Sequence, residues 1–87
     1  MGDLRSAFGQ KVRDLRLRRG WSQETLAERA AMHWTYISGL ERGRRNPGLN
    51  ALGQLAHALN LTVSDLLDGL ESGTRPKAAS RASRKSR

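Results

Sequence analysis

The chain has 87 residues, a length that allows one domain with a small core. Its 16 lysine and arginine residues outnumber eight acidic residues, and the resulting net charge of +8 favours polyanionic partners such as nucleic acid or anionic lipid. Cysteine is absent, which excludes a disulfide framework and a thiolate zinc site. Apolar runs are short and no signal peptide is visible, so we expect a cytoplasmic protein without membrane attachment.

Charge divides the chain into two parts. Residues 72–87 hold six basic groups and no acidic group, whereas residues 1–71 hold ten basic and eight acidic groups. The segment 72–87 also lacks large apolar side chains, so it cannot bury enough surface to offset the entropy lost on ordering. We therefore predict one folded domain over residues 1–71 and a disordered basic tail over residues 72–87.

The first helix is predicted from Asp3, a suitable N-cap, to Gly20, which ends it after two basic residues that suit the negative end of the helix dipole. Apolar residues recur at steps of four, four and three, which places them on one helical face. This apolar stripe consists of Leu4, Phe8, Val12 and Leu15.

Two short helices are expected to follow, separated by a tight turn. Ser22 can cap the first of them, and the second is predicted over about residues 34–42, ending at Gly43. The residues expected to face inward are Leu26, Ala27 and Ala30 in the first, and Ile37 and Leu40 in the second.

Two further helices complete the predicted fold. Pro47 marks where a fourth helix can begin, and Thr62 with Asp65 resembles a capping box for a fifth. Their apolar residues are Leu49, Leu52, Leu55, Ala56 and Leu59 in the fourth, and Leu66, Leu67 and Leu70 in the fifth. Because strand signals are missing, the predicted fold class is all-α, a compact domain of five helices.

The stretch from Trp21 to Gly43 is the most informative for function. Two short helices joined by a tight turn must cross closely, which requires a small residue such as Ala27 at their contact. One face of the second helix of this pair then has no role in the core, and a helix presented in this way fits the major groove of DNA. That face carries Trp34, Thr35, Ser38, Gly39 and Arg42.

Several short motifs occur in a fixed order over residues 5–70. They are Ser22-Gln23-Glu24 with Leu26-Ala27, Ile37-Ser38 with Leu40-Glu41-Arg42-Gly43, and Arg45-Asn46-Pro47 followed by leucines. In these motifs the chain resembles the lambda-repressor-like, Cro-type helix-turn-helix family, also called the xenobiotic-response-element (XRE) family. The resemblance implies a five-helix DNA-binding domain of bacterial or phage origin.

The resemblance also implies roles for individual residues. Gln23 is expected to contact phosphate and to brace the recognition helix, and the family pairs Arg16 with Glu41 in a structural ion pair. The base-facing positions are Trp34, Thr35, Ser38 and Gly39, with Tyr36 completing the DNA-contacting set on this helix. The residues expected along the DNA backbone are Arg42, Arg44 and Arg45.

Three positions depart from the family pattern. Ala31 stands where the turn usually has glycine, and an alanine held there in the left-handed conformation costs roughly 1–2 kcal/mol. His33 replaces a capping serine or threonine, and Gly48 replaces the usual cap of the fourth helix, although glycine is tolerated there. These departures affect turn geometry and local stability rather than the fold.

Some residues have a second interpretation. Gln23 can be an ordinary solvated side chain, and Trp34 can pack on its neighbours instead of offering apolar contact to a thymine methyl group. Gly39 is costly inside a helix and is explained either by close approach to DNA or by a position without a role. The tail can attract DNA phosphates, promote solubility or attach to a membrane surface.

No cofactor, metal ion, catalytic site or small-molecule substrate is expected. His33 and His57 lie in different predicted helices without carboxylate or thiolate ligands beside them. The loop over residues 43–48 lacks the lysine and the spacing of a phosphate-binding loop. No Ser-His-Asp set or carboxylate pair is apparent, so the chain is not expected to be an enzyme.

The predicted function is that of a sequence-specific transcriptional regulator, a repressor or autoregulator, that binds a pseudo-palindromic operator in double-stranded DNA as a homodimer. The dimer is implied by the family and by three leucines of the fifth helix that are left over for a partner, Leu66, Leu67 and Leu70. A first alternative keeps the fold but makes the chain an antitoxin or a restriction-modification controller protein. A second is a protein-interaction module in which the tail alone binds nucleic acid.

Overall fold

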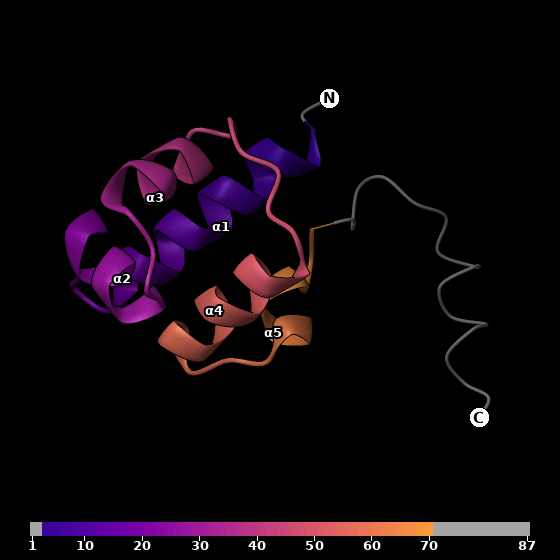
Figure 1. Cartoon of the computed structure of the whole chain (residues 1–87). Helices are drawn as coiled ribbons and strands as arrows, with labels where there is room; N and C mark the ends of the chain where they lie inside the picture. Colours follow the sequence, from indigo (N-terminus) through magenta and orange to yellow (C-terminus); the bar gives the residue numbers. More distant parts are fainter. Residues whose placement is uncertain (1–2, 71–87) are drawn as a thin grey trace, which may run out of the picture.

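The computed structural model describes residues 3–70. These residues form five helices and no strand, which confirms the predicted all-α class (Figure 1). The helices are α1 (Leu4–Arg18), α2 (Gln23–Ala30), α3 (Trp34–Glu41), α4 (Leu49–Leu59) and α5 (Val63–Leu67). The predicted tail over residues 72–87 and the predicted boundary at residue 71 lie outside the described residues.

Each of three helices begins at the capping residue that the sequence predicts. The Asp3 side chain accepts a hydrogen bond from the backbone N–H of Ser6 at 3.0 Å, and Ser22 accepts one from that of Thr25 at 3.0 Å. Thr62 and Asp65 form a complete capping box, each side chain accepting from the other's backbone N–H at 2.9 and 3.2 Å. These bonds satisfy backbone donors that a helix leaves without partners in its first turn.

Two helices end in the left-handed conformation without glycine. Ala31 after α2 has φ 59°, and Asn60 after α4 has φ 61°. At both ends the next backbone N–H donates five residues back, from Met32 to the Ala27 oxygen and from Leu61 to that of Ala56. This is the Schellman arrangement, in which asparagine is tolerated better than alanine. The predicted strain at Ala31 is therefore present in the turn that joins α2 to α3.

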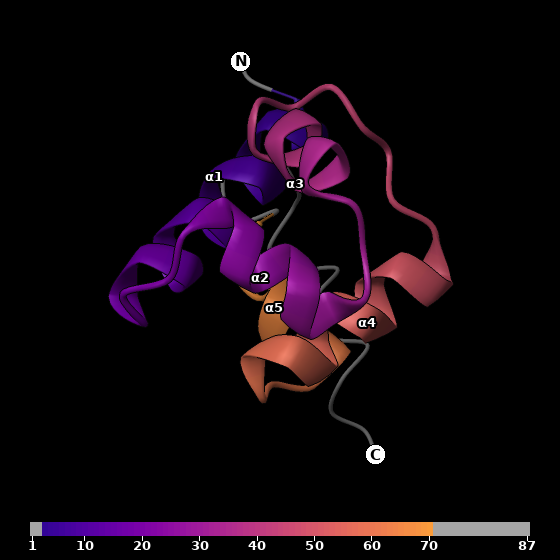
Figure 2. The same ribbon diagram turned by 60° about the vertical axis from the view of Figure 1, so that its left-hand side comes forward.

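The hydrophobic core draws residues from all five helices. Helix α1 packs against α3 and α5, α2 against α3 and α4, and α4 against α5. The views of Figures 1 and 2 agree that α3 lies at the periphery of this assembly. The buried apolar residues are Phe8, Val12, Leu26, Ala27, Ala30, Ile37, Leu40, Leu55, Ala56, Leu59 and Leu66.

Gly9 determines how closely α1 approaches the end of α3. A Cβ atom at this position would collide with the backbone oxygen of Leu40 and lie 2.9 Å from that of Glu41. Since backbone atoms cannot move aside, only glycine allows this approach. The contact holds α1 against the last turn of α3, and this brings Arg16 of α1 to Glu41.

Three predicted apolar positions differ from expectation. Leu4 and Leu49 are the first residues of α1 and α4 and remain exposed, Leu49 to 83%. Leu66 was predicted to be available for a partner, but it is fully buried in the core. Of the remaining leucines in this region, Leu70 is partly buried and Leu67 is 38% exposed. Within residues 3–70 no helix is long and apolar enough to cross a membrane.

Candidate nucleic-acid interface

Helices α2 and α3 and the turn at residues 31–33 form a helix-turn-helix unit (Figure 2). Ala27 is buried in the core, and α2 packs against α3. Gln54 of α4 reinforces the turn, since its Nε2 donates to the backbone oxygen of Ala30 at 2.8 Å. Sequence reasoning missed Gln54 because the two residues are 24 positions apart and no local pattern connects them.

The outward face of α3 is polar and accessible. Thr35 and Arg42 are exposed, Ser38 is half-buried, and Trp34 at the start of the helix is 47% exposed. Steps of four residues from 34 to 38 to 42 place these side chains along one side of the helix. The N-cap His33 makes no side-chain cap bond, so the start of α3, at the positive end of the helix dipole, lacks the bond that a capping serine or threonine would supply.

Arg16 and Glu41 form a buried ion pair between α1 and α3. Arg16 Nε donates to Glu41 Oε2 at 2.7 Å and Nη2 donates to Oε1 at 2.9 Å, while the side chains are only 7% and 3% exposed. The third donor, Nη1, bonds the backbone oxygen of Trp21 at 2.8 Å. Hydrogen bonding to Glu41 raises the pKa of Arg16 despite the opposing effect of burial, and the charges of Glu41 and Glu24 raise it further. The pair fixes the end of α3 against the scaffold.

Gln23, the first residue of α2, joins this network. Its Nε2 donates to Glu41 Oε1 at 3.0 Å, so the same carboxylate oxygen accepts from both Gln23 and Arg16. This bond holds the side-chain amide of Gln23 against α3, and it uses the amide nitrogen rather than the amide oxygen. The predicted phosphate contact of Gln23 stays a prediction.

Gly39 is covered by a side chain from outside α3, and its base-facing role stays a prediction. The residue is buried, and a Cβ built on it would lie 3.1 Å from Nε and 3.3 Å from Cγ of Arg45. The guanidinium carbon of Arg45 also lies 5.4 Å from the centroid of the Tyr36 ring. Arg45 therefore folds back over α3 and covers Gly39, which neither of the two interpretations of this glycine anticipated.

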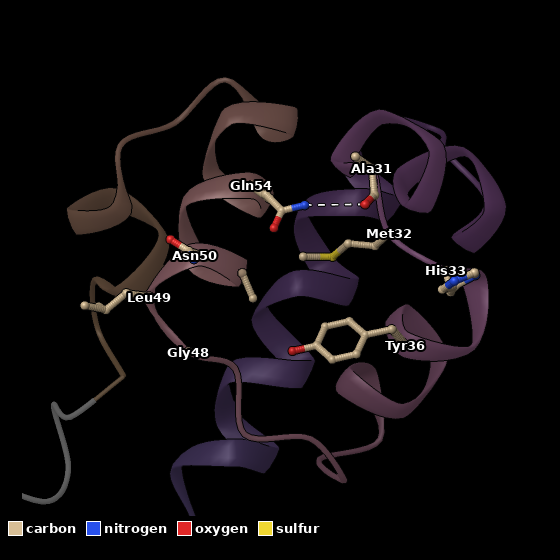
Figure 3. Close-up of a pocket in the computed structure, with 9 residues that line it drawn as sticks. Ala31, Met32, His33, Tyr36, Gly48, Leu49, Asn50 and Gln54 are labelled. Carbon is tan, nitrogen blue, oxygen red and sulfur yellow. Dashed lines mark hydrogen bonds between the residues drawn. The ribbon is translucent and has the colours of Figure 1, made fainter.

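Tyr36 faces an open groove of about 810 Å³ between α3 and α4. In Figure 3 its ring and hydroxyl extend toward α4, with Met32 and Gln54 beside it. Tyr36 is half-buried and packs against the core, so it lies at the edge of the exposed face of α3 rather than at its centre. Its DNA contact stays a prediction.

The segment after α3 adds positive charge next to this face. Arg42, Arg44 and Arg45 are exposed, and within residues 3–70 neither of the two ion pairs involves any of them. The same described residues contain no group of three or more histidine, cysteine or acidic side chains that could hold a metal ion. The arrangement is a helix with a polar face, bordered by arginines, on a rigid support.

A family model described as a helix-turn-helix domain matches residues 7–70. The chain belongs to this family. Its relatives include the control protein C.BamHI of Bacillus amyloliquefaciens, which is 46% identical over 67 residues covering 76% of this chain and 83% of that protein. They are regulators of the XRE type that the sequence motifs indicated.

Solved structures of helix-turn-helix proteins have the same fold. The restriction-modification controller protein C.AhdI from Aeromonas hydrophila is 43% identical with a TM-score of 0.68, covering 70% of this chain and 92% of that chain. The biofilm regulator SinR, known from Bacillus subtilis, was solved in complex with DNA. It is 34% identical with a TM-score of 0.66, covering 70% of this chain and 98% of that one.

Proposed function

We propose that this helix-turn-helix protein is a sequence-specific transcription regulator that inserts α3 into the major groove of a pseudo-palindromic operator as a homodimer. The observation that carries the proposal is the polar, exposed face of α3, which buried bonds from Arg16 and Gln23 to Glu41 hold in one position. A rigid support of this kind lets short side chains meet base edges at a fixed depth. The DNA complex of the similar SinR supports the same use of the fold.

Individual side chains then divide into two groups. Thr35 and Ser38 present hydroxyls to base edges, and Trp34 offers an apolar edge to a thymine methyl group. Arg42 and Arg44 lie along the phosphates, with Gln23 at the start of α2 on the neighbouring strand of the backbone. The first group sets sequence preference, whereas the second contributes affinity that depends on salt.

A symmetric dimer is supported by the apolar surface of α4 and α5. Leu49, Val63 and Leu67 are exposed, although leucine and valine favour burial. One recognition helix reads only a few base pairs, so pairing two copies about a twofold axis doubles the length of sequence that is read. We further propose that the protein acts in the bacterial cytoplasm without a cofactor and catalyses no reaction.

Control of a restriction-modification operon is a narrower form of the same function. It is favoured by the similarity to C.BamHI and C.AhdI, because the match extends over 83% of the first protein and 92% of the second. Genes for a methyltransferase and an endonuclease next to this gene would support it. The antitoxin role is a weaker alternative, because the relatives include regulators and controller proteins rather than toxin partners.

Selection of bound sites from a pool of random duplexes by the full-length chain tests the proposal. We expect a two-part site with inverted symmetry and half-sites one helical turn apart. Thr35→Ala and Ser38→Ala should each weaken binding to the selected duplex by up to about 1–3 kcal/mol and leave binding to random duplex nearly unchanged. A pool that returns no preferred sequence, or equal losses on both duplexes, would contradict base reading by α3.

A further inference from the structure

Arg45 is exposed, but its side chain lies back on α3, although no acidic group within residues 3–70 holds it. Its Nε and Cγ lie against Gly39, and its guanidinium stacks over Tyr36 at 5.4 Å from the ring centroid. Within residues 3–70 this guanidinium donates no hydrogen bond and joins no ion pair. Its five N–H donors are therefore available to a ligand while the side chain itself is already held.

The surface that holds Arg45 consists of two parts, the ring of Tyr36 and the bare backbone of Gly39. A guanidinium within about 6 Å of an aromatic centroid is attracted to the face of the ring. The absence of a side chain at Gly39 leaves space for the aliphatic part of Arg45 to lie flat on the helix. We call Gly39 and Tyr36 the Arg45 seat.

The Arg45 seat lies at the edge of the exposed face of α3, next to the proposed base contacts. Gly39 follows Thr35 by four residues, so the two are neighbours along α3, and Arg45 covers Gly39 at this place. Arg45 itself belongs to the loop after α3, but its side chain contacts α3 at Gly39 and Tyr36. By contrast, within residues 3–70 neither Arg42 nor Arg44 lies over an aromatic ring, and both are exposed and available to follow the phosphates.

We propose that Gly39 and Tyr36 are positioning residues that fix Arg45 at the edge of the reading face of α3, where Arg45 determines sequence by recognising guanine in each half-site. This inference rests on the proposed function and adds a reading residue from outside the recognition helix. A planar guanidinium pairs in a bidentate manner with O6 and N7 of guanine in the major groove. Because the side chain is ordered before DNA arrives, less rotamer freedom is lost on binding.

The seat predicts opposite effects of one substitution on stability and on binding. Gly39→Ala improves helix propensity, so the melting temperature of the full-length chain should stay the same or rise. The new methyl group needs the space that Arg45 occupies, so affinity for the duplex selected by the wild-type chain should fall about two- to tenfold per protomer. Affinity for a random duplex of equal length should change less than twofold.

Gly53→Ala in α4 is the matched control. Gly53 is also a helical glycine, but a Cβ atom there meets nothing within 4 Å. The control should stabilise the helix in the same way and leave both affinities unchanged. A loss of specific binding in Gly53→Ala equal to that in Gly39→Ala would overturn the role of the seat.

A double-mutant cycle connects Gly39 to Arg45. Arg45→Ala alone should weaken binding to the selected duplex about 5- to 150-fold, and repeating the site selection with it should remove one guanine preference from each half-site. In the Arg45→Ala background, Gly39→Ala should cause no further loss. A loss that persists there would mean that the methyl group crowds the DNA directly, and an unchanged set of preferred bases would place Arg45 on phosphate.

These outcomes separate the inference from the proposed function. If the wild-type chain selects no sequence, the proposed function fails. If it selects a site whose preferences do not depend on Arg45, the proposed function holds and the inference fails.

Discussion

Removal of the Glu41 carboxylate should destabilise this protein more than any exposed substitution. Glu41→Ala leaves the Arg16 guanidinium in a site where only 7% of its side chain is exposed, with two of its bonds and the bond from Gln23 lost. Breaking a buried ion pair on one side costs about 3–5 kcal/mol, because the remaining charge has no compensating partner. A domain of this size has a total stability of roughly 5 kcal/mol.

The assay is thermal unfolding followed by circular dichroism at 222 nm. For a domain of this size each kcal/mol shifts the melting temperature by about 4–8 °C, so Glu41→Ala should lower it by about 12 °C or more. Asp14→Ala provides the control, since Asp14 lies exposed on α1 and, within residues 3–70, its side chain accepts a hydrogen bond from Gln10 alone. Its melting temperature should stay within a few degrees of wild type.

A second variant separates loss of the pair from loss of packing. In Arg16→Met with Glu41→Leu both charges are replaced by apolar groups of similar volume, and most of the stability should return. A melting temperature for Glu41→Ala within about 4 °C of wild type would refute the argument from burial. Because the folded-state pKa of Arg16 is raised, its contribution is present below the pKa of unfolded arginine and is lost only as pH rises through the folded value. The stability contributed by the pair should therefore not change through titration of Arg16 near neutral pH.

Three further predictions follow from other parts of the chain. Ala31→Gly should raise the free energy of unfolding by about 0.5–1.5 kcal/mol, because glycine removes the left-handed strain at φ 59° but loses more conformational entropy on folding than alanine does. Chemical denaturation measures this change, and an unchanged or lower midpoint would contradict the prediction. Leu67→Lys should weaken a symmetric dimer by about 1–2 kcal/mol, roughly tenfold, without loss of helix. Sedimentation at several protein concentrations measures the dimer dissociation constant, and Leu17→Lys, at an exposed leucine of α1, is the control. Equal effects of the two substitutions would refute the α5 interface. A chain ending at Glu71 should keep its operator preference, while its log-log salt dependence becomes shallower by about one to two units per dimer, because basic groups in 72–87 no longer displace counterions; an identical slope would show that this segment does not contact DNA.

The sequence by itself determined the elements and the family. Caps such as Asp3 and Ser22 act on backbone groups three residues away, so the residues that set each helix start are adjacent in the printed chain. The spacing of apolar residues likewise indicated which face of each helix is buried, because helical periodicity is local. The partnership of Arg16 and Glu41 was accessible only through the family resemblance, since 25 residues separate them.

Tertiary structure alone decided how these elements meet, because contacts between distant segments depend on shape that no local pattern records. Gly9 admits the backbone of α3 at a distance that excludes any other residue, which its position in a regular helix does not reveal. Leu66 and Leu67 are neighbours of equal hydrophobicity, yet only the packing of α5 buries the first and leaves the second at the surface. Gly39 is covered by Arg45, which reaches back from the loop, so its role depends on a side-chain conformation that spacing along α3 cannot predict.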